Sequence, residues 1–226
     1  MNEWFEIRDI DIFVFFIVLA FIAVAQFYRG RRVNLQLIAY TARKLEELYQ
    51  PRDKNYWWIG IYVGFRALYK LSKSLLDRVE ITFILLPRYS IFYYPISKLV
   101  SRFDRIFLVY WFNCRVRREA HLVQKGYYRK RIDKVIDMRW LRMDKRIIRG
   151  KEYYAIYNDH SLLIRLVDML ERMKNPHLIK HIAFVPKNNT LYVAAQYDPL
   201  KLDEIVENTL RLAEEYAKEL EKKLSN

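Results

Sequence analysis

The run IFVFFIVLAFIAVAQFY, residues 12–28, decides how the rest of the chain is arranged. Its seventeen residues include five phenylalanines and a single polar side chain, Gln26. A helix needs about 17–25 apolar residues to cross a bilayer, so the run predicts a transmembrane helix at the short end of that range. A short span either thins the bilayer locally or favours packing against another helix, and the second alternative makes Gln26 a candidate contact within the membrane.

The charges on the two sides of this run predict its orientation. Residues 1–11 form a short stub with a net charge of −3, whereas Arg29, Arg31 and Arg32 directly follow the run. Cationic loops stay on the cytoplasmic side of a membrane. We therefore expect a single-pass protein of the cell membrane, with its N-terminus outside and the remaining chain in the cytoplasm.

Two other interpretations of the run compete with a membrane anchor. A secretory signal peptide would carry a positive N-terminal region, which this chain lacks, although Ala23-Val24-Ala25 resembles a cleavage site. A buried core helix is the second alternative. Five phenylalanines and no charge across residues 12–28 suit lipid better than a protein core.

Behind the anchor, the sequence predicts an α+β protein. Residues 29–52 are expected to form an amphipathic juxtamembrane helix, because Leu37, Ile38 and Leu45 recur at helical spacing. Residues 53–226 are expected to form a cytoplasmic α+β domain, with enough chain for one good core or two small ones. With a single cysteine, Cys114, the chain cannot form an internal disulfide.

Two parts of this domain have similar predicted orders of elements. The C-terminal unit, residues 152–224, is expected to run β-α-β-β-α, and residues 56–112 show the same order. In the first unit the predicted elements are strand 56–63, helix 65–76 and strands 79–86 and 89–94. The chain is therefore predicted to contain two repeats packed side by side, or two unrelated α+β stretches that look alike at this level.

Residue patterns typical of enzymes are missing from the sequence. It has no nucleophile elbow and no phosphate-binding P-loop. His177 and His181 are four residues apart, but Pro176 and the surrounding strand character prevent a shared helical face for a metal. Cys114 lies among arginines, which favour a thiolate, yet it has no partner base. We predict a non-enzymatic protein that uses no cofactor and no metal.

Residues 113–150 are the most basic part of a chain whose net charge is +14. They hold thirteen Lys or Arg against four acidic residues. Beside Tyr127 and Tyr128, these cations can grip phosphates while the rings stack on bases of single-stranded RNA. They can equally lie against anionic lipid headgroups, or form only a solvated, ion-paired face. The candidate phosphate- or headgroup-binding residues are Arg115, Arg117, Arg118, Arg129, Lys130 and Arg131.

Part of this basic stretch resembles a known family. Residues 111–124, WFNCRVRREAHLVQ, are similar to the pattern W-x3-R-V-x2-E-small-x-L-aliphatic-Q of the calumin family, also called coiled-coil domain-containing protein forty-seven. Eukaryotic members are subunits of the PAT complex. One membrane helix, a juxtamembrane helix, this motif and a terminal α+β unit follow one another in the family's order. The resemblance spans most of the chain at low identity and implies a short prokaryotic or archaeal relative.

The resemblance implies a chaperone role in membrane-protein biogenesis. Family members sit beside the translocon and the ribosome and shelter client transmembrane segments whose polar groups are costly in lipid. The expected partners are translocon or insertase membrane proteins, the ribosome or its rRNA, anionic lipid headgroups and client segments. The alternative is a membrane-tethered module that binds RNA or anionic lipid. The family's acidic luminal region and basic coiled-coil tail have no counterpart here, so luminal calcium binding and tail contact with the ribosome are not carried over.

Overall fold

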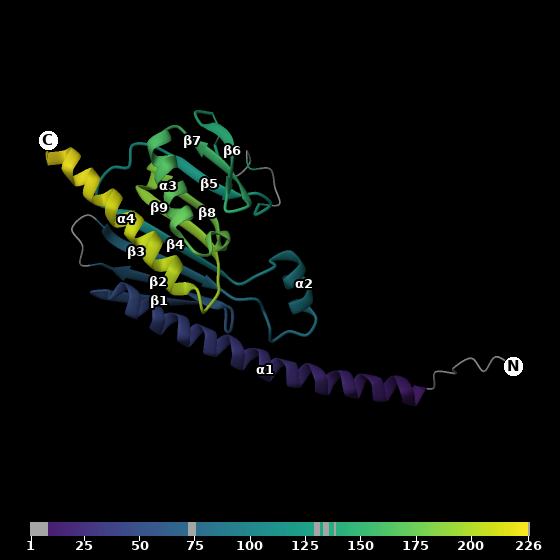
Figure 1. Cartoon of the computed structure of the whole chain (residues 1–226). Helices are drawn as coiled ribbons and strands as arrows, with labels where there is room; N and C mark the ends of the chain where they lie inside the picture. Colours follow the sequence, from purple (N-terminus) through teal and green to yellow (C-terminus); the bar gives the residue numbers. More distant parts are fainter. Residues whose placement is uncertain (1–8, 72–75, 129–131, 133–135, 138, 226) are drawn as a thin grey trace.

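An antiparallel sheet of nine strands lies at the centre of the computed structural model, which describes residues 9–71, 76–128, 132, 136–137 and 139–225 (Figure 1). The strands follow the order β1-β2-β3-β4-β9-β8-β5-β7-β6 across the sheet. They are β1 (Asp53–Ile59), β2 (Gly64–Lys70), β3 (Leu76–Ile84), β4 (Arg105–Phe112), β5 (Ala120–Gln124), β6 (Arg142–Ile148), β7 (Lys151–Tyr157), β8 (Ile179–Val185) and β9 (Thr190–Gln196).

Helices cover one face of this sheet. The four α-helices of the described chain are α1 (Asp9–Tyr49), α2 (Tyr93–Val100), α3 (His160–Arg172) and α4 (Leu202–Ser225). α4 lies in the middle, where it contacts α1, α3, β3 and β9. α1 packs on β2, and α3 packs on β5 and β8. Figure 1 shows α2 apart from this layer, at the end of the domain from which α1 projects.

The helix α1 belongs to the core along its second half only. It is continuous from Asp9 to Tyr49, so the predicted spans 12–28 and 29–52 lie on one unbroken helix that ends before Gln50. Its second half buries a single stripe of side chains, spaced three or four residues apart, which places them on one helical face. The stripe consists of Asn34, Ile38, Thr41, Leu45 and Tyr49.

Alternating side chains of the strands supply the opposite half of the core. In β4, Ile106, Leu108 and Tyr110 are buried, whereas the residues between them are only half-buried. The hydroxyl of Tyr110 lies 2.7 Å from that of Tyr49 on α1 and 2.8 Å from Thr209 Oγ1 on α4. Buried residues from both halves of the chain form one large cluster, so the sheet and its helices share a core.

The C-terminal unit has the predicted order of elements. β7, α3, β8, β9 and α4 follow one another as β-α-β-β-α. Asp159 is the N-cap of α3, and its side chain accepts a hydrogen bond from the Leu162 amide at 3.0 Å. Asn189 ends the short turn between β8 and β9 with a φ of 54°, a left-handed conformation that asparagine tolerates. The α+β fold class is therefore confirmed.

The first predicted repeat is wrong in two of its elements. Residues 64–70 form the strand β2 instead of part of a helix, and residues 89–94 form turns and the start of α2 instead of a strand. In β2, Phe65, Ala67 and Tyr69 are buried, which is the two-residue period of a strand. From β1 to β4 the order is β-β-β-α-β, so this part of the chain does not repeat the C-terminal unit.

Candidate functional site

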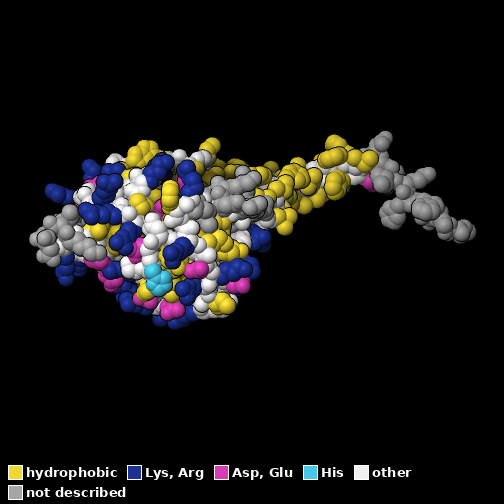
Figure 2. All heavy atoms as spheres, turned by 90° about the horizontal axis from the view of Figure 1, so that it is seen from above, with side chains coloured by type: hydrophobic (Ala, Val, Ile, Leu, Met, Phe, Trp, Pro, Cys, Tyr) yellow, Lys and Arg dark blue, Asp and Glu magenta, His cyan; other side chains and the backbone are white. Residues whose placement is uncertain are grey.

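The first half of α1 projects from the domain as an apolar rod, which Figure 2 shows as a hydrophobic stalk. The side chains of Phe13 and Phe21 are 65% and 71% exposed. Among the described residues, α1 is the one helix long and apolar enough to cross a membrane, and its apolar window is 0% buried. The run 12–28 is therefore not a buried core helix. Seventeen helical residues span about 26 Å, close to the thickness of a bilayer's hydrocarbon layer.

The rod is fixed to the domain at a contact that we call the anchor junction, formed by Gln26, Gly30, Asn34, Arg88 and Asp104. Gly30 packs against the segment that joins β3 to α2, where a β-carbon would lie 2.2 Å from the carbonyl oxygen of Arg88. Gln26 Nε2 donates a hydrogen bond to the same oxygen at 2.8 Å. Because only glycine permits this approach, α1 and the β3–α2 segment are held in direct backbone contact.

Asn34 and Arg88 extend the anchor junction into the domain. The buried Asn34 amide donates to the carbonyl oxygens of Tyr62 at 2.8 Å and Leu86 at 3.0 Å, and it accepts from Arg88 Nη1 at 3.2 Å. Arg88 also pairs with Asp104, whose Oδ1 accepts from the Leu86 amide at 2.7 Å. A satisfied buried network favours one arrangement of its members. The anchor junction therefore fixes the direction of the rod relative to the sheet.

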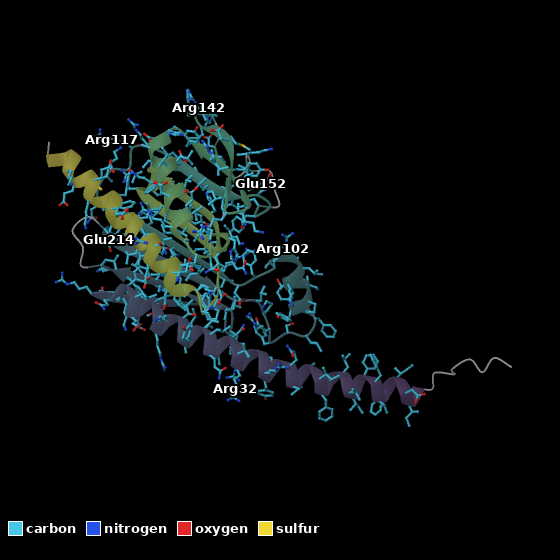
Figure 3. All side chains as sticks on the ribbon, viewed as in Figure 1. Arg32, Arg102, Arg117, Arg142, Glu152 and Glu214 are labelled. Carbon is cyan, nitrogen blue, oxygen red and sulfur yellow. The ribbon has the colours of Figure 1, made fainter. Side chains whose placement is uncertain are left out.

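The predicted juxtamembrane and intramembrane residues surround this junction. Arg29 and Arg32 are exposed, and Figure 3 shows Arg32 on the side of α1 that faces away from the sheet. Arg31 lies over the ring of Tyr62, 5.0 Å from its centroid. Gln26, predicted as a contact to another helix, has its hydrogen-bond partner within the chain.

A second candidate site, which we call the basic groove, lies at the opposite end of the domain. It is a pocket of about 370 Å³ between the β4–β5 connection, the start of α3 and the C-terminal half of α4. Figure 3 shows Arg117 beside the end of α4, remote from the projecting half of α1. The structure thus brings together three of the predicted arginines and adds one from α3. The arginines that line the groove are Arg115, Arg117, Arg118 and Arg165.

Asp159 forms one wall of the basic groove. It is buried, caps α3 and forms an ion pair with Arg118. Burial opposes ionisation of this carboxyl, but hydrogen bonds from Ser161, Arg118 and the Leu162 amide hold its pKa well below the usual range. Arg118 is therefore paired with a carboxylate that stays charged at neutral pH.

The remaining positive charge of the groove comes from two exposed arginines. Arg165 pairs with Glu219, but within the part of the chain that the structure describes, Arg115 and Arg117 form no ion pair. Their guanidinium groups can bind a carboxylate or phosphate in a forked geometry. Cys114 lies in the same pocket and is buried, and this burial raises the pKa of its thiol. The neighbouring arginines therefore do not make it a reactive thiolate.

The other three cations of the predicted basic site are not placed relative to this groove. Arg129, Lys130 and Arg131 lie outside the described residues. Tyr127 and Tyr128, predicted to stack on bases, pack on a small second core around Val123. Burial raises the pKa of Tyr128 to about 12. Both rings are half-buried in this packing, and their stacking on bases stays a prediction.

A series of hydrogen-bonded side chains that runs from Tyr128 through the buried His181 and His121 to Glu119 has no direct signal in the sequence. His181 Nε2 lies 3.1 Å from His121 Nδ1, the Tyr128 hydroxyl lies 2.7 Å from His181 Nδ1, and Glu119 Oε1 lies 2.8 Å from His121 Nε2. All three bonds are satisfied when Tyr128 donates to His181, His181 to His121, and His121 to Glu119. Burial, with a smaller effect of His121, lowers the pKa of His181 to about 3, so this ring is neutral. Only the register of β5 against β8 brings the two histidines together.

Comparisons with known proteins do not assign the chain to a family. No protein-family model matches it, and no curated protein matches it. A similar solved structure is the crystal structure of the mycobacterial trehalose monomycolate transport factor A, TtfA. It is 10% identical with a TM-score of 0.41, over 78% of this chain and 92% of that chain. The resemblance to calumin gains no support from these comparisons.

Proposed function

We propose that the protein is a single-pass membrane protein whose α+β domain is a non-enzymatic docking platform in membrane-protein biogenesis. The observation that carries this proposal is the anchor junction. One unbroken helix passes from an exposed apolar rod into the core of the domain, and Gly30 and Asn34 fix it there. A domain attached in this way is not free to reorient on a flexible linker. It therefore presents the same surfaces at a fixed distance from the membrane.

The charges at the end of the rod support a cytoplasmic position for the domain. Arg29, Arg31 and Arg32 lie at the point where the apolar surface of α1 ends. Cations at this position are retained on the cytoplasmic side. The domain then faces the compartment in which membrane proteins are synthesised.

The proposed partners of the rod are subunits of the translocon or of an insertase, together with client transmembrane segments. Phenylalanines such as Phe16 and Phe21 are exposed along its length, and the run is short for a span. A short span is relieved by packing against other helices. The rod therefore provides a surface for helix–helix contact as well as an anchor.

Photo-crosslinking in native membranes tests these partners. A photoreactive residue at Phe21 should yield adducts with channel or insertase subunits. The control is the same residue at Leu200, which is 86% exposed on the domain and should not yield them. Adducts of Phe21 that contain lipid alone would contradict the proposed partners.

A membrane-tethered RNA-binding protein is the second candidate, and the basic groove favours it. The groove offers Arg115 and Arg117 to an anion and lies at the end of the domain remote from the rod (Figure 3). In the proposed orientation it is out of reach of the lipid headgroups, so RNA or an acidic protein segment suits it better. A photoreactive residue at Arg117 that recovers RNA, combined with lipid adducts alone at Phe21, would favour this second function.

A further inference from the structure

The helix α2 turns its apolar side chains away from the protein. Phe92, the N-cap residue, is 67% exposed, and Ile96 and Leu99 on α2 are 54% and 76% exposed, while Ser97 is the residue that α2 buries. Spacings of four and three residues place the three apolar side chains on one helical face. A surface helix of a soluble domain normally shows the reverse pattern, with its apolar face towards the core. The outward face of α2 therefore needs an apolar covering.

The position of α2 indicates what covers it. The segment before the helix contacts the last residues of the apolar run, since Tyr89 packs on Phe27 with ring centroids 6.4 Å apart. The adjoining Arg88 carbonyl accepts from Gln26 and lies against Gly30. Figure 1 shows α2 at the same end of the domain as the projecting half of α1. When the rod spans a bilayer, α2 lies at the level of the lipid headgroups.

A cationic pocket adjoins the C-terminal end of α2. It has a volume of about 430 Å³, and its cations are Arg102, Arg105, Lys125 and Lys180. Lys125 is paired with Glu152, and no carboxylate is among the described residues that line the pocket. Arg105 Nε is buried without a hydrogen-bond partner in the described structure. Burial, helped by the charge of Lys151, lowers the pKa of Lys180 to about 8. An anion in the pocket would provide a missing acceptor and a counter-charge.

We propose that this end of the protein is a lipid-binding surface, with the apolar face of α2 in the interfacial layer and the phosphate of an anionic phospholipid in the cationic pocket. The proposal rests on the proposed anchoring of α1 in a membrane. The exposed Lys98 lies on α2 and the exposed Arg102 follows its C-terminal end, and cations are common on helices that lie in a membrane interface. The domain is then held at two points, by α1 through the bilayer and by α2 on its surface.

Spin labels on the full-length protein in phosphatidylcholine–phosphatidylglycerol vesicles measure the depth of α2. The variants are Phe16→Cys in the rod, Leu99→Cys on α2 and Leu200→Cys as a matched exposed leucine, each combined with Cys114→Ala. The hydroxyl of Tyr40 on α1 donates to the carbonyl of Pro199, the neighbour of Leu200, at 3.3 Å. Tyr40 lies twelve residues, about 18 Å, beyond the end of the apolar run.

Collision of each label with oxygen relative to a water-soluble nickel chelate reports lipid exposure. We expect this ratio to be several-fold higher for the labels at positions 16 and 99 than for the label at 200. A label at position 98, from Lys98→Cys, should be shallower than the label at 99. A lipid-exposed label at 16 with a water-exposed label at 99 would overturn the placement of α2 and leave the anchor intact. Water exposure at both positions would overturn the anchoring itself.

Retention of phosphatidylglycerol after detergent extraction tests the cationic pocket. The wild-type protein should retain this lipid in preference to phosphatidylcholine, as measured by mass spectrometry. Arg102→Gln with Arg105→Gln should reduce the preference roughly five-fold for each charge removed. The control, Arg142→Gln with Arg146→Gln, removes the same charge from β6, at a distance from α2, and should keep the preference (Figure 3). An equal decrease in both variants, or no preference in the wild type, would overturn the pocket as the lipid site.

Discussion

His181 makes the stability of the fold depend on pH at the scale of a single residue. Its burial lowers its pKa to about 3, whereas a histidine in the unfolded chain titrates near 6.5. Below pH 6.5 the unfolded chain binds a proton that the folded protein does not bind. The free energy of unfolding should therefore be unaffected above pH 6.5 and should fall as the pH drops towards 3, by about 2 kcal/mol at pH 5.

Urea unfolding in detergent at pH 7 and pH 5 measures this change. His181→Gln removes the titrating group and should lose this contribution, although the variant is less stable at both pH values. His177→Gln is the matched control, because His177 is exposed on the neighbouring turn. An unchanged pH dependence in His181→Gln would show that the buried histidine is not its source.

Gly30 is a second residue with an effect beyond its own position, because its lack of a side chain lets α1 touch the β3–α2 segment. Gly30→Ala places a methyl group 2.2 Å from the Arg88 carbonyl oxygen, and a backbone atom cannot move away as a flexible side chain would. We expect a decrease of about 1–3 kcal/mol in the free energy of unfolding. Gln36→Ala, exposed on the same helix, should change it by less than about 0.5 kcal/mol. Equal stability of the two variants would show that the two backbones do not touch at the anchor junction.

At the scale of the element, α1 is the proposed membrane anchor and also a part of the core. Leu45 is 0% exposed against the sheet. Leu45→Ala should therefore reduce the free energy of unfolding of the domain by about 2–5 kcal/mol, as for other large-to-small core substitutions. Arg43→Ala on the exposed face is the control and should have little effect. An unchanged free energy of unfolding in Leu45→Ala would show that the stability of the domain does not depend on the packing of α1.

The elements that were predicted well from the sequence are those with a clear local period. The stripe of Ile38 and Leu45 on α1 is a local signal, and the structure contains it. Phe65 and Leu68 fit a helical stripe and so predict a helix, although Phe65, Ala67 and Tyr69 also alternate as in the strand β2 that the structure contains. The contact of His121 with His181 depends on strand register, which no local pattern contains.

At the scale of the whole molecule, charge and apolar surface are divided between two ends. One end carries the rod, the outward face of α2 and the pocket around Arg102, and the other carries the basic groove around Arg117 (Figure 3). The sequence predicts lipid or RNA as the ligand of the basic residues but does not separate the two uses. The separation follows from the fold, since residues 102 and 117 are close in sequence but β4 carries the chain from one end to the other.

This division predicts that RNA binding depends on the groove and not on the net charge of +14. Arg115→Gln with Arg117→Gln should weaken binding of single-stranded RNA and reduce the slope of log affinity against log salt by about 0.7 for each phosphate that the variant no longer binds. Arg142→Gln with Arg146→Gln lowers the net charge equally on β6 and should leave the slope unchanged. Equal effects of the two variants would show that RNA responds to the overall charge alone. Absence of RNA binding by the wild-type protein would leave an acidic protein segment as the ligand that the two exposed guanidinium groups fit.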